Sequence, residues 1–72
     1  MDRTQCKMAR VGLGWRAQDL AKAAGVGSAT VARFELGGNI ANASRDKLEA
    51  ALRAAGAQFS QGAKRVGVTV PE

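Results

Sequence analysis

The 72-residue sequence predicts a single, mainly α-helical domain that ends in a short β-hairpin or strand. Alanine is abundant, tyrosine is absent and β-branched residues are sparse until the end, which favours helices through most of the chain. Near the C-terminus the pattern has a period of two, because Val66, Val68 and Val70 alternate with Gly67 and Thr69. A chain of this length supports one marginal core, so a partner subunit is the expected stabiliser.

The first two helices are expected at residues 4–13 and 17–24. Thr4 is a suitable N-cap for the first helix, and Gly25 suits the left-handed position that follows the second. Both segments have apolar residues at spacings of three and four, which is typical of a helix with one buried face. These residues are Cys6, Ala9 and Leu13 in the first helix and Ala17, Leu20, Ala21 and Ala24 in the second.

The third and fourth helices are expected at residues 28–36 and 45–55. Ser28 and Ser44 can cap them, and residues 39–42 form the loop between them. The expected buried residues are Val31 and Phe34 in the third helix and Leu48, Ala51, Leu52 and Ala55 in the fourth. In the terminal hairpin, Phe59 lies on the first strand, residues 60–64 form the turn, and the three valines lie on the second strand.

Charge favours a polyanionic partner, and nucleic acid in particular. Eleven Lys and Arg side chains stand against six Asp and Glu, which gives a net charge of +5. Between Arg3 and Arg33 there are six basic residues, whereas Asp19 is the only acidic one. A small, unevenly basic domain binds polyanions through counterion release, although a merely solvated surface is the alternative interpretation.

Several function classes lack the residues that they need. There is no His and only one cysteine, Cys6, so no zinc cluster or intrachain disulfide can form, and Cys6 is expected to be a buried apolar residue. No nucleophile–base set, cofactor motif or small-molecule site is evident, so an enzyme is not expected. No signal-type or membrane-spanning apolar run is present, which predicts a soluble cytoplasmic protein. No cofactor or metal is expected, because the residues that would bind one are missing.

The stretch LAKAAGVGSATVARFE contains a glycine break between two helices. A dinucleotide-binding loop would need a preceding strand and a third glycine, but here a helix precedes the break and Thr30 stands in the glycine's place. The break is then an ordinary bend in a helical bundle or the turn of a helix-turn-helix unit. The second interpretation is more specific, since it requires a small residue at the helix crossing, a glycine at the turn and apolar residues that lock the pair. Those residues are Ala21, Gly25, Leu20, Val26, Val31 and Phe34.

The stretch RAQDLAKAAGVGSATVARFELG resembles the phage-repressor and Cro type of helix-turn-helix protein, also called the xenobiotic-response-element (XRE) family. The resemblance covers residues 4–55 and implies a compact, lambda-repressor-like four-helix DNA reader that is usually dimeric. The matching positions are Leu20-Ala21, Gly25-Val26, Val31, Phe34-Glu35-x-Gly37, Leu48 and Leu52. The sequence departs from the family at Ala17, where glutamine is usual, at Arg16, where a small hydroxyl cap is usual, and at Leu36, where polar residues are common.

The resemblance implies where DNA would be contacted. The third helix enters the major groove, and its outward residues would read the bases: Ser28, Ala29, Ala32 and Arg33. The phosphate contacts would come from helix ends and the following loop, that is from Arg16, Lys22, Thr30, Asn39, Asn42, Ser44 and Arg45. The family also implies an ion pair between Arg10 on the first helix and Glu35 at the end of the third.

The expected organisation is a DNA-binding domain at residues 1–56 and a β-like dimerisation segment at residues 57–72. One module contacts few bases, so useful specificity implies a homodimer on a palindromic operator. The expected function is a sequence-specific repressor or autoregulator. The alternative is a helix-turn-helix fold retained for protein interaction, an anti-activator or antitoxin-like module with weak DNA binding. The expected dimer interface consists of Phe59, Val66, Val68 and Val70.

Overall fold

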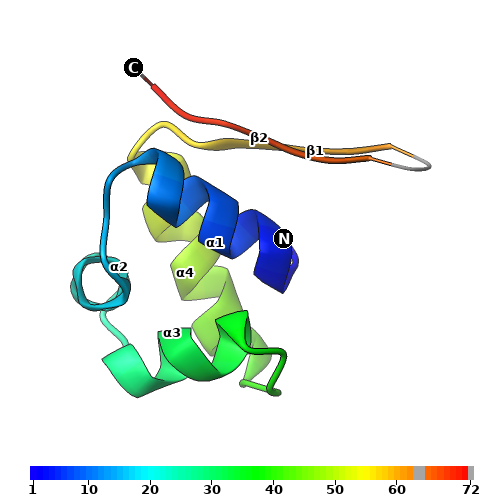
Figure 1. The fold of residues 1–72 in the computed structure, drawn as a ribbon. Coiled ribbons are helices and arrows are strands. Elements are labelled where there is room, and N and C mark those ends of the chain that lie inside the picture. Colours follow the sequence, from blue (N-terminus) through cyan, green and yellow to red (C-terminus); the bar gives the residue numbers. More distant parts are fainter. Residues whose placement is uncertain (63–64, 72) are drawn as a thin grey trace.

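The computed structural model describes residues 1–62 and 65–71, with side chains for residues 1–59 and 68–71. The described chain contains four helices followed by an antiparallel hairpin, which confirms the predicted fold class (Figure 1). The elements are α1 (Arg3–Gly12), α2 (Ala17–Ala24), α3 (Ser28–Glu35), α4 (Asn42–Ala54), β1 (Gln58–Gly62) and β2 (Arg65–Thr69).

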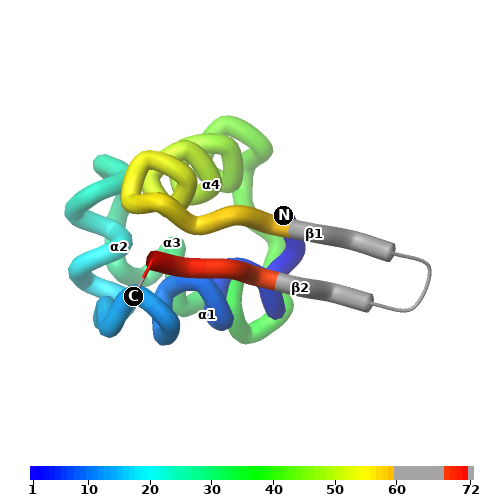
Figure 2. Tube along the Cα trace, turned by 90° about the horizontal axis from the view of Figure 1, so that it is seen from above, coloured from blue at the N-terminus to red at the C-terminus, as the bar shows by residue number. Residues whose placement is uncertain are grey.

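Helices α1 and α4 form the centre of the molecule, with α3 on one side and the hairpin on the opposite side (Figure 1). Seen from the hairpin side, β1 continues from α4 while β2 returns beside α1 (Figure 2). Helix α2 packs against α3 and α4. The predicted inward faces meet in one core, which consists of Cys6, Ala9, Leu20, Ala21, Val31, Phe34, Leu48, Leu52 and Ala57. The other residues predicted on these faces are only partly buried, namely Leu13, Ala17, Ala24, Ala51 and Ala55.

Helix α1 begins one residue earlier than predicted, and Thr4 is not its cap. Asp2 is the N-cap, and its carboxylate accepts the backbone N–H of Gln5 at 2.8 Å. The Gln5 side-chain oxygen in turn accepts the Asp2 backbone N–H at 3.0 Å. This capping box satisfies two amide donors reciprocally, which a threonine inside the first turn could not do. Gln5 is consequently almost fully buried, a position that the apolar spacing did not reveal.

The starts of α3 and α4 also differ from the prediction. Gly27 has the extended backbone of an N-cap, so Ser28 is already the first helical residue. Helix α4 begins at Asn42, inside the expected loop, with Ala41 as an N-cap that makes no side-chain bond. Ser44 therefore lies within the first turn of α4 and does not cap it. Packing of the α4 face determines where this helix begins, in the absence of a side-chain cap.

The hairpin is confirmed, but its strands are longer than predicted. Residues 60–62 belong to β1 and pair with β2, so they do not form the turn, while residues 63 and 64 lie outside the described residues. The register places Phe59 opposite Val68 and Gln58 opposite Thr69. Backbone pairing extends along both strands, so residues 60–62 are part of the ladder in place of the expected turn.

The hairpin covers one end of the helical core. Ala57 is buried, and Phe59, Val68 and Val70 pack against the core as partly buried side chains. Val70 lies so close to α1 that a Cβ added to Gly12 would stand 2.8 Å from a Val70 methyl carbon. The guanidinium of Arg53 lies 5.1 Å from the centre of the Phe59 ring. Three of the four predicted dimer-interface residues therefore contact their own chain, and the side chain of Val66 lies outside the described residues.

Candidate nucleic-acid interface

Helices α2 and α3 are joined by a tight turn that fixes their relative orientation. Gly25 ends α2 in the predicted left-handed conformation, with φ of 73°. The next amide, that of Val26, donates to the Ala21 carbonyl at 3.0 Å. Ala21 is almost fully buried between the helices, and Val31 of α3 is fully buried. The turn thus folds α3 back across α2 as a helix-turn-helix unit requires.

The outward face of α3 is free of contacts with the core. Ser28, Ala29, Ala32 and Arg33 are all exposed, as a surface that reads bases must be. Val31 and Phe34 hold the opposite face of the same helix inside the protein. Because the buried and exposed residues lie on opposite faces of the helix, one side of α3 is accessible to a ligand.

Two hollows flank this exposed face and bring predicted DNA-contact residues together. The hollow towards α4 has a volume of about 350 Å³ and joins α3 to the loop and first turn of α4. The hollow towards α2 has a volume of about 490 Å³ and joins α3 to the start of α2. The first is lined by Ala29, Thr30, Arg33, Asn39, Ile40, Ala41 and Ser44, and the second by Arg16, Ala17, Gln18, Ser28, Ala29 and Ala32.

Three predicted phosphate contacts lie outside both hollows. Lys22 is exposed on α2, one turn after the residues that line the nearer hollow. Asn42 and Arg45 are exposed on the first turn of α4, where the Arg45 guanidinium donates to the Asn42 side-chain oxygen at 3.2 Å. Arg45 lines a third hollow, which joins the start of α1 to the end of α3 and the loop that follows it and also contains Arg3 and Asn39.

Arg10 and Glu35 meet and hold the end of α3 against α1. Nε and Nη2 of Arg10 each donate to one Glu35 carboxylate oxygen at 2.8 Å, a bidentate pair. The remaining nitrogen, Nη1, donates to the Trp15 carbonyl at 2.9 Å, just before α2. The side chains are 15% and 9% exposed, and the bond to Glu35 raises the pKa of Arg10. One guanidinium therefore links α1, the approach to α2 and the C-terminus of α3.

Comparison with known proteins agrees with this geometry. A family model described as helix-turn-helix matches residues 7–61, which include all four helices apart from the first turn of α1. The chain belongs to this helix-turn-helix family. It is of the phage-repressor, or XRE, type, whose members are DNA-binding regulators. No curated protein matches the chain by sequence.

The sequence pattern does not indicate Gln18 or Gly38 as site residues, but the structure places both beside the α3 face. Gln18 is exposed at the second position of α2 and lines the same hollow as Arg16 and Ser28, so its amide can reach a ligand bound there. The adjacent Ala17, where the family usually has glutamine, was the one signal that could have directed attention to it. The Arg16 backbone N–H donates to the Asp19 carboxylate at 2.8 Å, but no described side chain accepts the first amides of α2 in place of the missing hydroxyl cap.

Gly38 supports the Arg33 side chain. Its backbone N–H donates to the Arg33 carbonyl at 2.8 Å, and a Cβ at this position would stand 2.5 Å from Arg33 Cγ and 2.9 Å from the same carbonyl oxygen. A side chain at residue 38 would therefore displace both the Arg33 stem and the last turn of α3. The sequence indicated only that Gly37 and Gly38 follow the third helix.

Cys6 is buried beneath the Arg10–Glu35 pair. Its thiol donates to a Glu35 oxygen at 3.8 Å and is fully shielded from solvent. Burial is the main reason that the pKa of Cys6 rises from 9.0 to about 12, and the Glu35 charge and hydrogen bond raise it further. The predicted buried, apolar role of Cys6 is thus combined with a hydrogen bond to the residue that ends α3.

We expect the folded protein to lose stability between about pH 9 and pH 12 through Cys6. The raised pKa means that the unfolded thiol loses its proton first, so this contribution is complete below pH 9 and decreases as pH rises towards 12. Urea unfolding at pH 8, 9.5 and 10.5 should show a steeper decrease for wild type than for Cys6→Ala. Parallel slopes for the two proteins would contradict this assignment.

No helix among residues 1–62 and 65–71 is both long and apolar enough to cross a membrane.

Proposed function

We propose that this protein is a sequence-specific transcriptional regulator that inserts the helix at residues 28–36 into the major groove of DNA. The carrying observation is the exposed face of α3, bordered on both sides by hollows that contain polar and basic residues. Arg33 is the strongest candidate base reader, because a guanidinium can bond guanine O6 and N7 together. Ala29 and Ala32 offer apolar contact, for example with a thymine methyl, and Ser28 can serve bases or phosphate.

The phosphate contacts are proposed on both sides of α3. Arg16 supplies them from the α2 side, and Thr30, Asn39 and Ser44 supply them from the α4 side, since each lines a hollow beside the reading face. Further phosphate contacts are proposed from three residues outside these hollows, namely Lys22, Asn42 and Arg45. Such contacts fix the position of the protein on the duplex, while few side chains read bases, so DNA shape contributes to the choice of site.

We infer that the protein acts in the cytoplasm as a homodimeric repressor or autoregulator on a palindromic operator. One reading helix covers a single half-site, so two copies are needed for useful specificity. The hairpin is the proposed interface, because each described strand pairs on one side only and has an open edge. Since Phe59, Val68 and Val70 also pack on the core of their own chain, the strand edges are better suited to this role, and Val66 remains a proposed interface residue.

The dimer is tested by sedimentation of full-length variants. Val66→Lys is expected to shift the protein towards monomer and to weaken operator binding, because it places a charge in the proposed interface. Ala50→Lys adds the same charge at an exposed position of α4 and should leave both properties unchanged. A Val66→Lys protein that sediments like wild type would place the interface elsewhere.

The function is tested by selecting bound duplexes from random DNA and measuring their affinity at several salt concentrations. A regulator of this kind yields a palindromic consensus, and its specific affinity decreases as salt rises. A reporter fused to the protein's own promoter then distinguishes repression from activation and shows whether the protein controls its own synthesis.

The protein-interaction module is the second candidate function. The observation in its favour is that two of the four exposed α3 positions are alanines, which make few base contacts. That function predicts no consensus from the selection and only weak, salt-sensitive binding to any duplex.

A further inference from the structure

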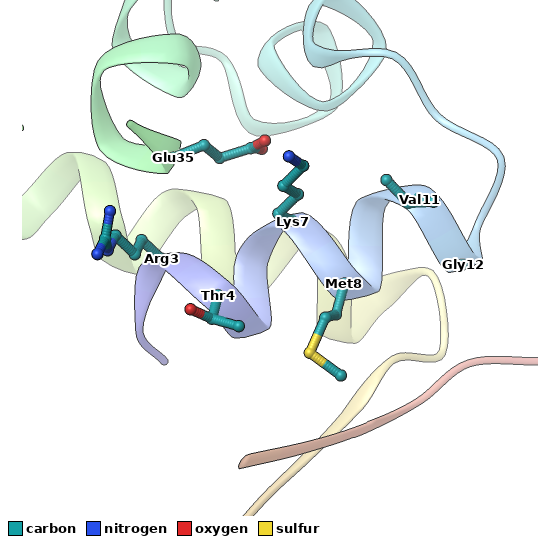
Figure 3. A pocket seen from close by; sticks show the side chains of 7 residues that line it. All are labelled: Arg3, Thr4, Lys7, Met8, Val11, Gly12 and Glu35. Carbon is teal, nitrogen blue, oxygen red and sulfur yellow. The ribbon is translucent and has the colours of Figure 1, made fainter. Parts of the chain in front are cut away.

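The outward face of α1 forms a groove that the proposed DNA contacts do not use. It has a volume of about 530 Å³ and lies along α1 beside the end of α3 (Figure 3). Its α1 residues follow two parallel rows at a spacing of four, on the side of the helix opposite Cys6 and Ala9. The lining residues are Arg3, Thr4, Lys7, Met8, Val11, Gly12 and Glu35.

The groove combines two kinds of side chain. Arg3 and Lys7 are cations, and Met8 and Val11 are apolar side chains that are 42% and 58% exposed. Both apolar side chains are exposed well beyond the core residues of the same helix. The groove thus combines a polar, cationic part with an apolar part of a size that accepts several side chains.

The groove has surplus positive charge. Among the residues with described side chains, Glu35 is the only acidic one that lines the groove, and Arg10 already binds both of its carboxylate oxygens. Arg3 and Lys7 supply two positive charges against this single paired carboxylate, although Figure 3 shows the Lys7 amine end pointing towards Glu35. An anionic partner is therefore electrostatically favoured over a neutral or basic one.

A second copy of the chain fits this face poorly. Parallel pairing of two α1 helices would bring Arg3 and Lys7 against the same cations, and antiparallel pairing would cover them with Met8 and Val11. In the parallel arrangement the cations of the two copies repel each other. In the antiparallel arrangement Arg3 and Lys7 lose their hydration without gaining a negatively charged partner. DNA could satisfy the cations but would gain nothing from the apolar half.

We propose that this α1 groove binds an acidic, amphipathic peptide segment of another protein. Carboxylates of that segment contact Arg3 and Lys7, while its apolar side chains pack on Met8 and Val11. The groove shares no residue with either hollow beside α3, although its Arg3 also lines a third hollow with Asn39 and Arg45, two proposed phosphate contacts. Peptide binding needs none of the proposed base-reading residues, so the proposal does not depend on the proposed regulatory function.

The test uses a fluorescein-labelled helical peptide of about fifteen residues with leucines on one face and glutamates elsewhere. Fluorescence anisotropy with the full-length protein should give saturable binding that weakens as salt rises. Lys7→Glu should weaken it at least about fivefold, since charge reversal replaces attraction by repulsion. Val11→Asn should also weaken it, through loss of apolar contact. Lys47→Glu, at an exposed α4 position outside the groove, should stay within about twofold of wild type.

Five results would overturn the proposal. Absence of saturable binding, or equal losses in Lys7→Glu and Lys47→Glu, would remove the site. Equal binding of a matched peptide with lysine in place of every glutamate would show a contact without charge selectivity. A change of sedimentation in Val11→Asn would indicate that a second copy covers the groove, and an equal loss of nonspecific duplex binding in Lys7→Glu would assign the face to nucleic acid. Melting curves verify that each variant is folded.

Discussion

Glu35→Ala is expected to lower the free energy of unfolding by about 3 kcal/mol, the lower end of the cost of breaking a buried ion pair. The substitution leaves the Arg10 guanidinium and the Cys6 thiol without their acceptor in a largely buried site. A domain of this size is stable by only about 4–11 kcal/mol. The melting temperature should therefore decrease by more than about 10 °C, which thermal and urea unfolding can measure.

Glu49→Ala is the matched control for this loss. Glu49 also accepts two ionic bonds, from the N-terminal ammonium at 3.0 Å and from Arg53 at 3.4 Å, but its side chain is 34% exposed. The bond to Arg53 joins two exposed side chains and contributes at most about 1 kcal/mol. Glu49 is more exposed than Glu35, although its ammonium partner is buried, so Glu49→Ala should be the milder variant. The double variant Arg10→Met/Glu35→Leu should be less destabilised than Glu35→Ala, because it removes the unpaired charge as well. Equal losses for Glu35→Ala and Glu49→Ala would refute the structural importance of the pair.

Arg33→Ala is expected to reduce discrimination between the selected operator and unrelated DNA by about 1–3 kcal/mol, while nonspecific binding is almost unchanged. Arg33 is exposed on the proposed reading face and lines the hollow between α3 and α4. Among the proposed base readers it alone carries a side chain that can make a bidentate contact with a base. Competition binding with operator and random duplexes measures the ratio of specific to nonspecific affinity directly.

Arg45→Ala provides the contrast to Arg33→Ala. Arg45 is a proposed phosphate contact, so its removal should weaken binding to both duplexes by a similar factor and reduce the salt dependence by about one counterion. An unchanged sequence preference in Arg33→Ala would exclude Arg33 as a base reader, even if total affinity decreases.

The core of this fold could be predicted because its signal is periodic. Leu20 and Ala21 lie three and four residues after Ala17, and the pairs Val31 and Phe34, and Leu48 and Leu52, are also at helical spacing. These six residues are buried as predicted. Gly25 was equally predictable, since its left-handed conformation favours glycine and the turn requires it at that point. Periodicity and backbone preference are local properties, so they can be recognised without knowledge of the tertiary contacts.

The helix starts were predicted less well because several polar residues compete for each cap. At α1 the N-cap is Asp2, which exchanges hydrogen bonds with Gln5, and not Thr4. At α3 the N-cap is Gly27, one residue before Ser28. At α4 no side chain caps the helix, and Ser44 lies in its first turn. Tertiary packing determines which of these residues begins the helix, and such packing cannot be recognised from a local sequence pattern.

The candidate site was predictable in outline but not in arrangement. The outward residues of the third helix followed from its inward ones, because a helix with one buried face exposes the other. The grouping of Arg16 with Ser28, and of Arg33 with Asn39 and Ser44, depends on how α2 and α4 cross α3. The role of Gly38 depends on a close approach of backbone to side chain that no sequence pattern describes.

The contact between Gly38 and the Arg33 stem has a thermodynamic consequence. A free arginine side chain samples many rotamers, and immobilising it opposes binding by up to about 2 kcal/mol. Because the stem already lies against the loop backbone, fewer of those rotamers remain to be frozen when a ligand arrives. If Arg33 binds DNA as proposed, the association entropy is thus partly determined by the absence of a single methyl group, on a residue that need not touch the ligand at all.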